Sequence, residues 1–172
     1  MKKSDKSIHN ISIASIKRST IKPYDFNCTR FYEEHTAFKN AYPEIEIGFS
    51  STELVICSTV IDKNNFSVLT TQKLITKEKG ILLSSNLNGA SVKAYGDFKG
   101  YKKDSFTFGI IHLADGNEFK YFIETGRASM VMIHGVKTRI QVNAMTDSQV
   151  IKVAAIWTGK TDSSSNPSNS TI

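Results

Sequence analysis

Three residues of this chain have the chemistry of a cysteine-dependent catalytic site. Cys57 could supply a nucleophile with His112 as its base and Asp97 as a third member, provided that folding brings them into one cleft. Cys57, however, lies inside the apolar run 54–61, and a thiol in such a run is usually inert packing. The sequence therefore predicts that the protein is not an enzyme.

The sequence Thr158-Gly159-Lys160-Thr161 resembles the end of a phosphate-binding P-loop. The full motif needs a glycine where this chain has Ala154, and a helix after it, whereas a Ser-rich tail follows here. Cys28 and Cys57 are expected to be free thiols in a reducing compartment. No metal-binding spacing occurs among the cysteines or among the histidines His9, His35, His112 and His134, so we predict no metal and no cofactor.

Positive charge is concentrated in two parts of the chain. The net charge is +6, and seven lysines between residues 73 and 103 face only Glu78 and Asp97. Such a segment could attract an acidic protein surface or phosphate groups, although lysines at strand edges also simply discourage aggregation. The partner-binding residues predicted on this basis are Lys73, Lys77, Lys99, Lys102 and Lys103.

Residues 1–22 form the second basic region. Their isoleucines fit neither helical nor strand spacing for long, so we expect a flexible arm, with an edge strand at 11–16 as the alternative. This arm could bind a polyanion, either nucleic acid or anionic lipid headgroups, and such binding weakens steeply with salt. Its contributing residues would be Lys2, Lys3, Lys6, Lys17 and Arg18.

The elements that would position these residues begin with a helix at 25–42. One face of this helix would carry apolar or aromatic residues spaced three or four apart, and Pro43 would end it. Those residues are Cys28, Phe31, His35, Phe38 and Tyr42. We expect this helix to lie against a sheet.

From residue 44 onward the spacing becomes that of β-strands. Strands are predicted at 45–49, 54–61, 66–70, 74–76, 81–83, 92–95 and 98–101. A hairpin is predicted at 105–124, because Asp115-Gly116 supplies a tight turn between two alternating runs. A helix follows at 127–142, residues 149–158 are either strand or helix, and 159–172 form a disordered tail.

The stretch 66–76, FSVLTTQKLIT, resembles the strand, Thr-containing turn, basic residue and strand of the bacterial pleckstrin-homology-like (PH-like) domains. The later hairpin and helix fit the same plan, so the resemblance covers 53–141. It implies an α+β, mainly antiparallel fold, in which a PH-like bent sheet or barrel of seven strands is closed by a C-terminal helix. The helix at 25–42 would be an addition to a single domain at 23–158. The family also implies a binding or scaffolding role, often with self-association, but assigns no ligand-contacting residue.

No apolar run is long enough to cross a bilayer, and we expect a cytoplasmic bacterial protein. We predict a non-catalytic module that acts through protein–protein contacts. Exposed strand edges could pair with a partner or with another copy of the chain, because their N–H and C=O groups are ready templates.

Overall fold

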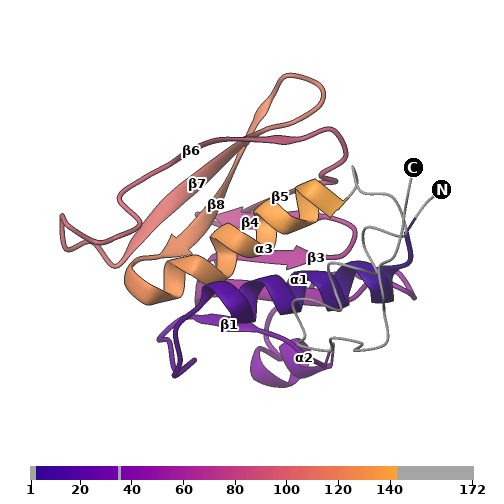
Figure 1. Cartoon of the computed structure of the whole chain (residues 1–172), viewed down its shortest axis with the longest axis horizontal. Coiled ribbons are helices and arrows are strands. Elements are labelled where there is room, and N and C mark those ends of the chain that lie inside the picture. Colours follow the sequence, from indigo (N-terminus) through magenta and orange to yellow (C-terminus); the bar gives the residue numbers. More distant parts are fainter. Residues whose placement is uncertain (1–2, 35, 143–172) are drawn as a thin grey trace, which may run out of the picture.

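The computed structural model describes residues 3–34 and 36–142, which form two antiparallel sheets and a layer of two long helices (Figure 1). The strands are β1 (Thr29–Phe31), β2 (Val55–Asp62), β3 (Asn65–Thr70), β4 (Leu74–Glu78), β5 (Ile81–Ser85), β6 (Ser91–Tyr95), β7 (Phe106–His112) and β8 (Glu118–Glu124). The helices are α1 (Asp5–Ser19), α2 (Ala37–Ala41) and α3 (Ser129–Val142). Four sequence predictions fall outside the described residues: His35, the segment 149–158, the P-loop-like motif and the tail 159–172.

The N-terminal segment is a helix, so the flexible arm predicted at 1–22 and the alternative edge strand at 11–16 are both wrong. The Ser4 side chain caps α1 by accepting a hydrogen bond from the backbone N–H of Ser7 at 3.1 Å. Small serines complete the helical face that the isoleucines only partly define. The buried face includes Ile8, Ile11, Ser12, Ser15 and Ile16. Because α1 packs against α3, the domain includes this helix and does not begin at residue 23.

The helix predicted at 25–42 is also wrong, because this stretch contains a strand and one short helix. β1 pairs antiparallel with β2, with Thr29 opposite Thr59 and Phe31 opposite Cys57. The buried carboxylate of Glu124 accepts hydrogen bonds from the backbone N–H groups of Asn27 and Cys28 and from the Thr29 hydroxyl. These contacts with distant strands outweigh the local helical spacing, and only α2 remains helical.

Two predicted strands are absent. Residues 45–49 form an irregular segment in which Ile45 is buried and Phe49 packs edge-on against Phe38, 6.2 Å between ring centroids. Residues 98–101 form turns, because the Asp97 carboxylate accepts hydrogen bonds from the backbone N–H groups of Tyr101 and Lys102. Side-chain bonds of this kind compete with strand pairing.

The remaining strand predictions are confirmed. Strands β2 to β5 form an up-and-down arrangement within the five-stranded sheet, whose order is β1-β2-β3-β4-β5. The first six residues of β2 are all buried, as expected for a strand covered on both faces. One face of the sheet packs on α1, α3 and the second sheet, and the other on Tyr32, Phe38 and Ile45.

The second sheet has the order β6-β7-β8 and contains the predicted hairpin. β7 and β8 pair from Phe106 opposite Glu124 to His112 opposite Glu118, and Gly116 in the turn has φ of +90°. The two sheets meet where the backbone N–H of Phe122 donates to the Ser67 hydroxyl at 2.8 Å. This contact sets β8 across β3 and β4 of the first sheet.

The C-terminal helix is confirmed, with a 3₁₀ turn at Gly126–Ala128 leading into α3. α1 and α3 run antiparallel, because Ser15 lies beside Thr138 and Ile16 beside Gly135. A Cβ on Gly135 would lie 2.8 Å from the Cys57 sulfur, so this glycine lets α3 approach the sheet closely. The fold is therefore α+β, with two mainly antiparallel sheets and a C-terminal helix; the strands do not join into one hydrogen-bonded barrel over the described residues.

Candidate functional site

The three residues considered for catalysis do not form a reactive cysteine site. Cys57 has no exposed surface, and its thiol points to the Val131 carbonyl at 4.0 Å. Burial alone strongly raises the pKa of this thiol, which disfavours a thiolate nucleophile. His112 is exposed at the end of β7, and Asp97 binds backbone N–H groups of its own loop. Cys57 is thus packing within the core.

The predicted partner-binding lysines are divided between two ends of the molecule. Gln72, at the turn that precedes Lys73, donates to Asp5 at the start of α1 at 3.1 Å. The loop that carries Lys99, Lys102 and Lys103 lies at the other end, because the Gly126 N–H donates to the Phe98 carbonyl just before α3 (Figure 1). The five residues therefore do not form one basic surface.

Lys73 stabilises the fold itself. Its Nζ donates to the Gly48 carbonyl at 3.0 Å, lies 3.5 Å from the buried Glu53 carboxylate and sits over the Phe49 ring. Lys77 is half-buried on β4, directly opposite Leu82 of β5. The three loop lysines are exposed and remain available to a partner.

Three of the basic residues predicted for the N-terminal arm, Lys6, Lys17 and Arg18, lie on α1, and Lys3 precedes it. Lys17 forms an ion pair with Glu33, Lys6 and Arg18 are exposed, and Lys2 lies outside the described residues. Because α1 is packed on α3, these residues cannot move as a flexible arm to contact a polyanion.

Strand β5 carries the feature that sequence reasoning missed. Its apolar residues Ile81, Leu82 and Leu83 are 66%, 49% and 60% exposed, although each was predicted only as ordinary strand material. The strand has no charged residue, and it is hydrogen-bonded to β4 on one side only. The available signal was the sequence ILLSS itself, an uncharged apolar run beside a Lys-Gly turn.

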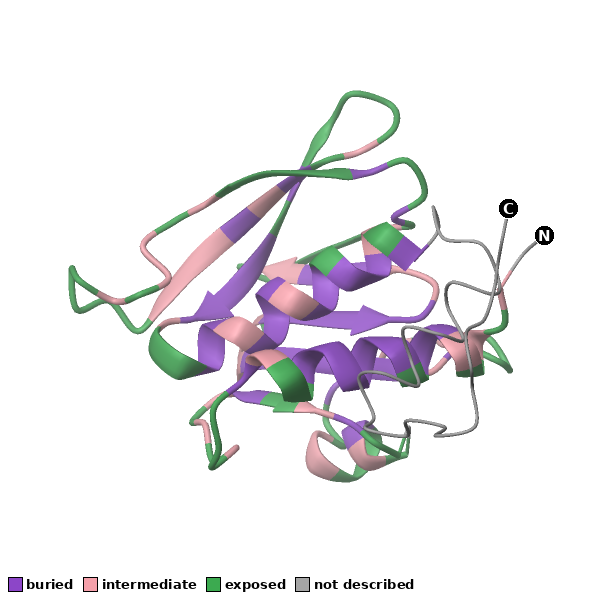
Figure 2. Cartoon of the chain, viewed as in Figure 1, coloured by how far each residue is buried: buried purple, intermediate pink, exposed green. Residues whose placement is uncertain are grey.

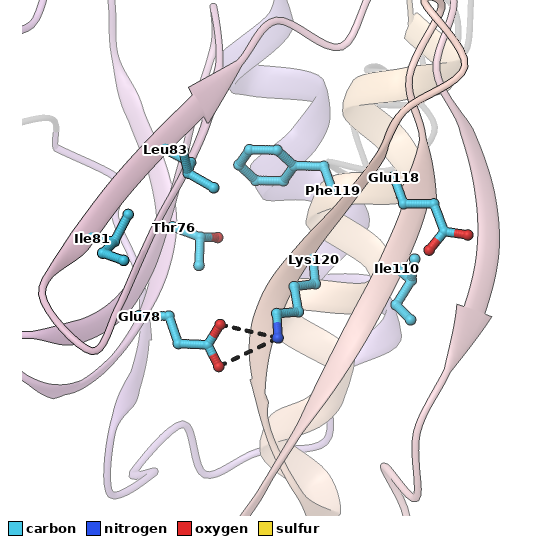
Figure 3. A pocket seen from close by; sticks show the side chains of 8 residues that line it. All are labelled: Thr76, Glu78, Ile81, Leu83, Ile110, Glu118, Phe119 and Lys120. Carbon is cyan, nitrogen blue, oxygen red and sulfur yellow. Dashed lines mark hydrogen bonds and ion pairs between the residues drawn. The ribbon is translucent and has the colours of Figure 1, made fainter.

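A groove runs along the inner face of β5, between the two sheets. Its volume is about 350 Å³, and its apolar lining includes Ile81 and Leu83 on one side and Ile110 and Phe119 on the other. Figure 3 shows the Phe119 ring pointing across the groove toward Leu83. The Lys120 ammonium bridges the groove to the Glu78 carboxylate at 3.0 Å. The groove thus combines an apolar lining with an ion pair, between Lys120 and Glu78, that spans it.

The turn before β5 determines which backbone groups face outward. Lys79 and Gly80 have φ values of 51° and 81°, the conformation of a two-residue type I′ turn closed by Glu78 and Ile81. In such a hairpin the closing pair is hydrogen-bonded, and hydrogen-bonded pairs alternate along the strands. Ile81 and Leu83 therefore bond toward β4, whereas the N–H and C=O groups of Leu82 and Ser84 face away from it.

Other kinds of site are not found in the described part of the chain. No group of three or more His, Cys, Asp or Glu side chains there could hold a metal ion, and no helix there is long and apolar enough to cross a membrane. Both cysteines are free thiols.

Comparison with known proteins gives no assignment. No protein-family model matches the chain, and no curated protein and no solved structure shows significant similarity to it. The functional argument therefore depends on the geometry of the β5 edge and its groove.

Proposed function

We propose that this protein is a non-catalytic scaffolding module that assembles with a second copy of itself by pairing β5 with β5. The observation that carries this proposal is the exposure of Ile81, Leu82 and Leu83 on a strand whose outer edge has no hydrogen-bonded neighbour in the described chain. Unpaired strand edges are templates for the addition of another strand. Pairing would join two five-stranded sheets into one continuous sheet.

One register satisfies both the backbone and the side chains. An antiparallel pair centred on Leu82 places Leu82 opposite Leu82 of the second copy, and Ile81 opposite Leu83. The outward N–H and C=O groups of Leu82 then bond to each other across the two-fold axis. The Ser84 N–H of one copy would donate to the Gly80 carbonyl of the other. The Gly80 N–H needs no partner from the second copy, because it already donates to the Asn64 carbonyl at 3.1 Å.

In this register every exposed apolar side chain of β5 meets another. Ile81 and Leu83 lie on the face that borders the groove, so their counterparts from the second copy would extend its apolar wall. Leu82 lies on the other face, beside Lys77. Apolar pairs directly opposite each other across strands stabilise a sheet by about 0.2–1 kcal/mol each.

Charge also favours a second copy as the occupant. β5 carries no charged residue, so like charges do not meet across the two-fold axis between the paired strands. A charged partner would instead be selected by complementary charges at the edge, and β5 has none to offer. A self-complementary surface of this kind is what an isologous dimer requires.

The PH-like resemblance belongs to the same proposal. A meander of β2 to β5, a second sheet of β6 to β8 and the closing α3 follow the order that the family implies. Self-association and the absence of catalysis are likewise family expectations. A cytoplasmic location in a bacterium is also proposed, supported by two cysteines that remain unbonded.

Electrostatic binding of a polyanion is the second candidate function. It is favoured by Lys99, Lys102 and Lys103, which are exposed together in the loop between β6 and β7. Nucleic acid or anionic lipid bound in this way should dissociate steeply as salt is raised. Binding that does not change with salt would contradict this candidate.

Sedimentation velocity over a range of concentrations tests the dimer. Replacing the half-exposed Leu82 with Lys removes about 1 kcal/mol of apolar burial from each copy and sets two ammonium groups against each other. We expect Leu82→Lys to weaken dimerisation by at least about 30-fold. The matched control is Val92→Lys on β6, where a 38% exposed valine offers the same change outside the β5 edge.

The control should dimerise like the wild-type chain. A wild-type protein that stays monomeric up to about 500 µM, a concentration at which even weak pairs associate, would contradict self-assembly. Equal dimerisation of Leu82→Lys and the wild type would place the interface elsewhere.

A further inference from the structure

A second surface, in the groove between α1 and α3, has the opposite chemistry to the β5 edge. Its volume is about 360 Å³, and the described residues that line it supply basic side chains and hydroxyl groups but no carboxylate. The residues that matter are Arg18, His134 and Lys137 together with Ser15, Ser19 and Thr138. None of these belongs to the β5 edge or to its groove.

The two helices bring these residues together by regular spacing. Ser15, Arg18 and Ser19 share one face of α1, and His134, Lys137 and Thr138 share one face of α3, since both sets are spaced three and four residues apart. The floor of the groove is fixed by the hydrogen bond between the Ser15 and Thr138 hydroxyls, at 2.8 Å. The helices lie close because Gly135 has no side chain, and a Cβ there would be 3.3 Å from Ile16.

No described residue neutralises the positive charge of this groove. Arg18 and Lys137 form no ion pair with any described residue, whereas neighbouring Lys17 is paired with Glu33. Half-buried His134 has its pKa lowered, first by burial and then by the charge of Lys137. An anion in the groove would relieve this repulsion between like charges.

We infer that the groove between α1 and α3 binds a phosphate monoester. Arg18 can hold two phosphate oxygens at once with its planar guanidinium group, while Lys137 supplies a point charge. The Ser19 hydroxyl can donate to the remaining oxygen, and His134 can donate when protonated. The groove has room for a phosphate group and part of its substituent, and the rest of the substituent would extend into solvent.

Isothermal titration with phenyl phosphate tests this inference, at constant ionic strength and with acetate as the comparison anion. We expect saturable binding of phenyl phosphate, and at least about tenfold weaker binding by Arg18→Gln and by Lys137→Gln. Lys63→Gln makes the same charge change in the exposed turn between β2 and β3, which does not line the groove, and should leave binding unchanged. Because Arg18 and Lys137 are exposed, both variants should fold normally.

A second readout reports on the groove directly. In NMR titrations the pKa of His134 should rise by about half a unit or more when phenyl phosphate is bound, because a nearby anion favours the imidazolium. Binding that is equally strong for acetate, that survives both substitutions, or that leaves the His134 pKa unmoved would overturn the inference.

Free and membrane-bound phosphate can be separated with vesicles. Vesicles of phosphatidylcholine with phosphatidic acid present the same phosphate monoester on a bilayer. Co-sedimentation that is lost in Lys137→Gln would make a lipid headgroup the ligand source, whereas binding of phenyl phosphate alone would make the source soluble. Neither result depends on whether β5 pairs with a second copy.

Discussion

Two edge strands of the described sheets, β5 and β6, differ in charge and in the regularity of their pairing. Both are five residues long and are exposed along almost their whole length; Figure 2 shows this clearly for β6. β6, however, carries Lys93, which is paired with Glu118, and its register is shifted between Val92 and Ala94. β5 pairs with β4 without a shift and has no charge.

This difference shows which edge is protected. Charged side chains and bulges are the usual devices that stop an edge strand from recruiting another chain. β6 has both a charged residue and a bulge, and β5 has neither, although the two strands belong to the same domain. We therefore expect β5, and not β6, to accept a second strand, and four changes to the chain test this difference.

The largest effect is expected at Gly109 of β7, the strand that pairs with β6. A Cβ on Gly109 would lie 2.4 Å from the Tyr121 ring, and Tyr121 is fully buried and cannot move away. Gly109→Ala should therefore lower the free energy of unfolding by about 1–3 kcal/mol, measured by denaturant titration. Gly48→Ala, where nothing lies within 4 Å of the added carbon, should cost far less. Equal losses in both variants would mean that β7 is not so tightly constrained.

The next effect concerns the backbone of β5 alone. Ser84→Pro removes an N–H that faces away from β4, so the five-stranded sheet should survive while pairing with a second copy weakens by about tenfold. Ser84→Ala keeps the N–H and should dimerise within about twofold of the wild type. If proline at this position unfolds the domain, the outward direction of the Ser84 N–H is wrong.

A smaller effect is expected when the protection of β6 is removed. Lys93→Ile replaces the charged residue with an apolar one, so β6 should gain a tendency to associate, visible in light scattering as a few-fold rise in average mass at high concentration. The increase stays small because the bulge between Val92 and Ala94 remains. Lys93→Arg should scatter like the wild type. An unchanged Lys93→Ile would show that the bulge alone protects β6.

The smallest effect tests the lysines that the sequence singled out. Replacing Lys99, Lys102 and Lys103 with Gln should leave dimerisation within about twofold of the wild type, because their loop lies outside the β5 edge. A marked loss of dimerisation in sedimentation velocity would return these lysines to the interface. Salt-dependent polyanion binding, if present, should be lost in the same variant.

The central part of the fold could be predicted from the sequence because its signals are local. Strand alternation, the Asp115-Gly116 turn and the apolar spacing after Gly126 each determine an element without help from distant residues. The N-terminal third could not be predicted in this way. The buried face of α1 includes Ser12 and Ser15, whose polar side chains hide the helical pattern in the sequence. β1 depends on distant residues, because it pairs with β2 and its neighbour Cys28 donates to the Glu124 carboxylate.

The sequence predicted the kind of surface, an exposed strand edge, but not which strand would form it. Strand edges as pairing surfaces were expected, but nothing in the sequence showed that β5 would be the last strand of its sheet. The lysines predicted to bind a partner do not form one cluster in space, because Lys73 and Lys99 lie at different ends of the molecule and Lys73 contacts Glu53 and Gly48. Edge position and exposure depend on strand order, which local spacing does not contain.

Hydrogen exchange at the backbone amides of β5 gives the most direct test of self-assembly, measured on the full chain at low and high protein concentration. Pairing centred on Leu82 predicts that the Leu82 and Ser84 amides are protected at least about tenfold more strongly at high concentration. The amides of β6 should not change, and Leu82→Lys should remove the protection. Exchange at Leu82 and Ser84 that is equally fast at every concentration would contradict pairing through this edge.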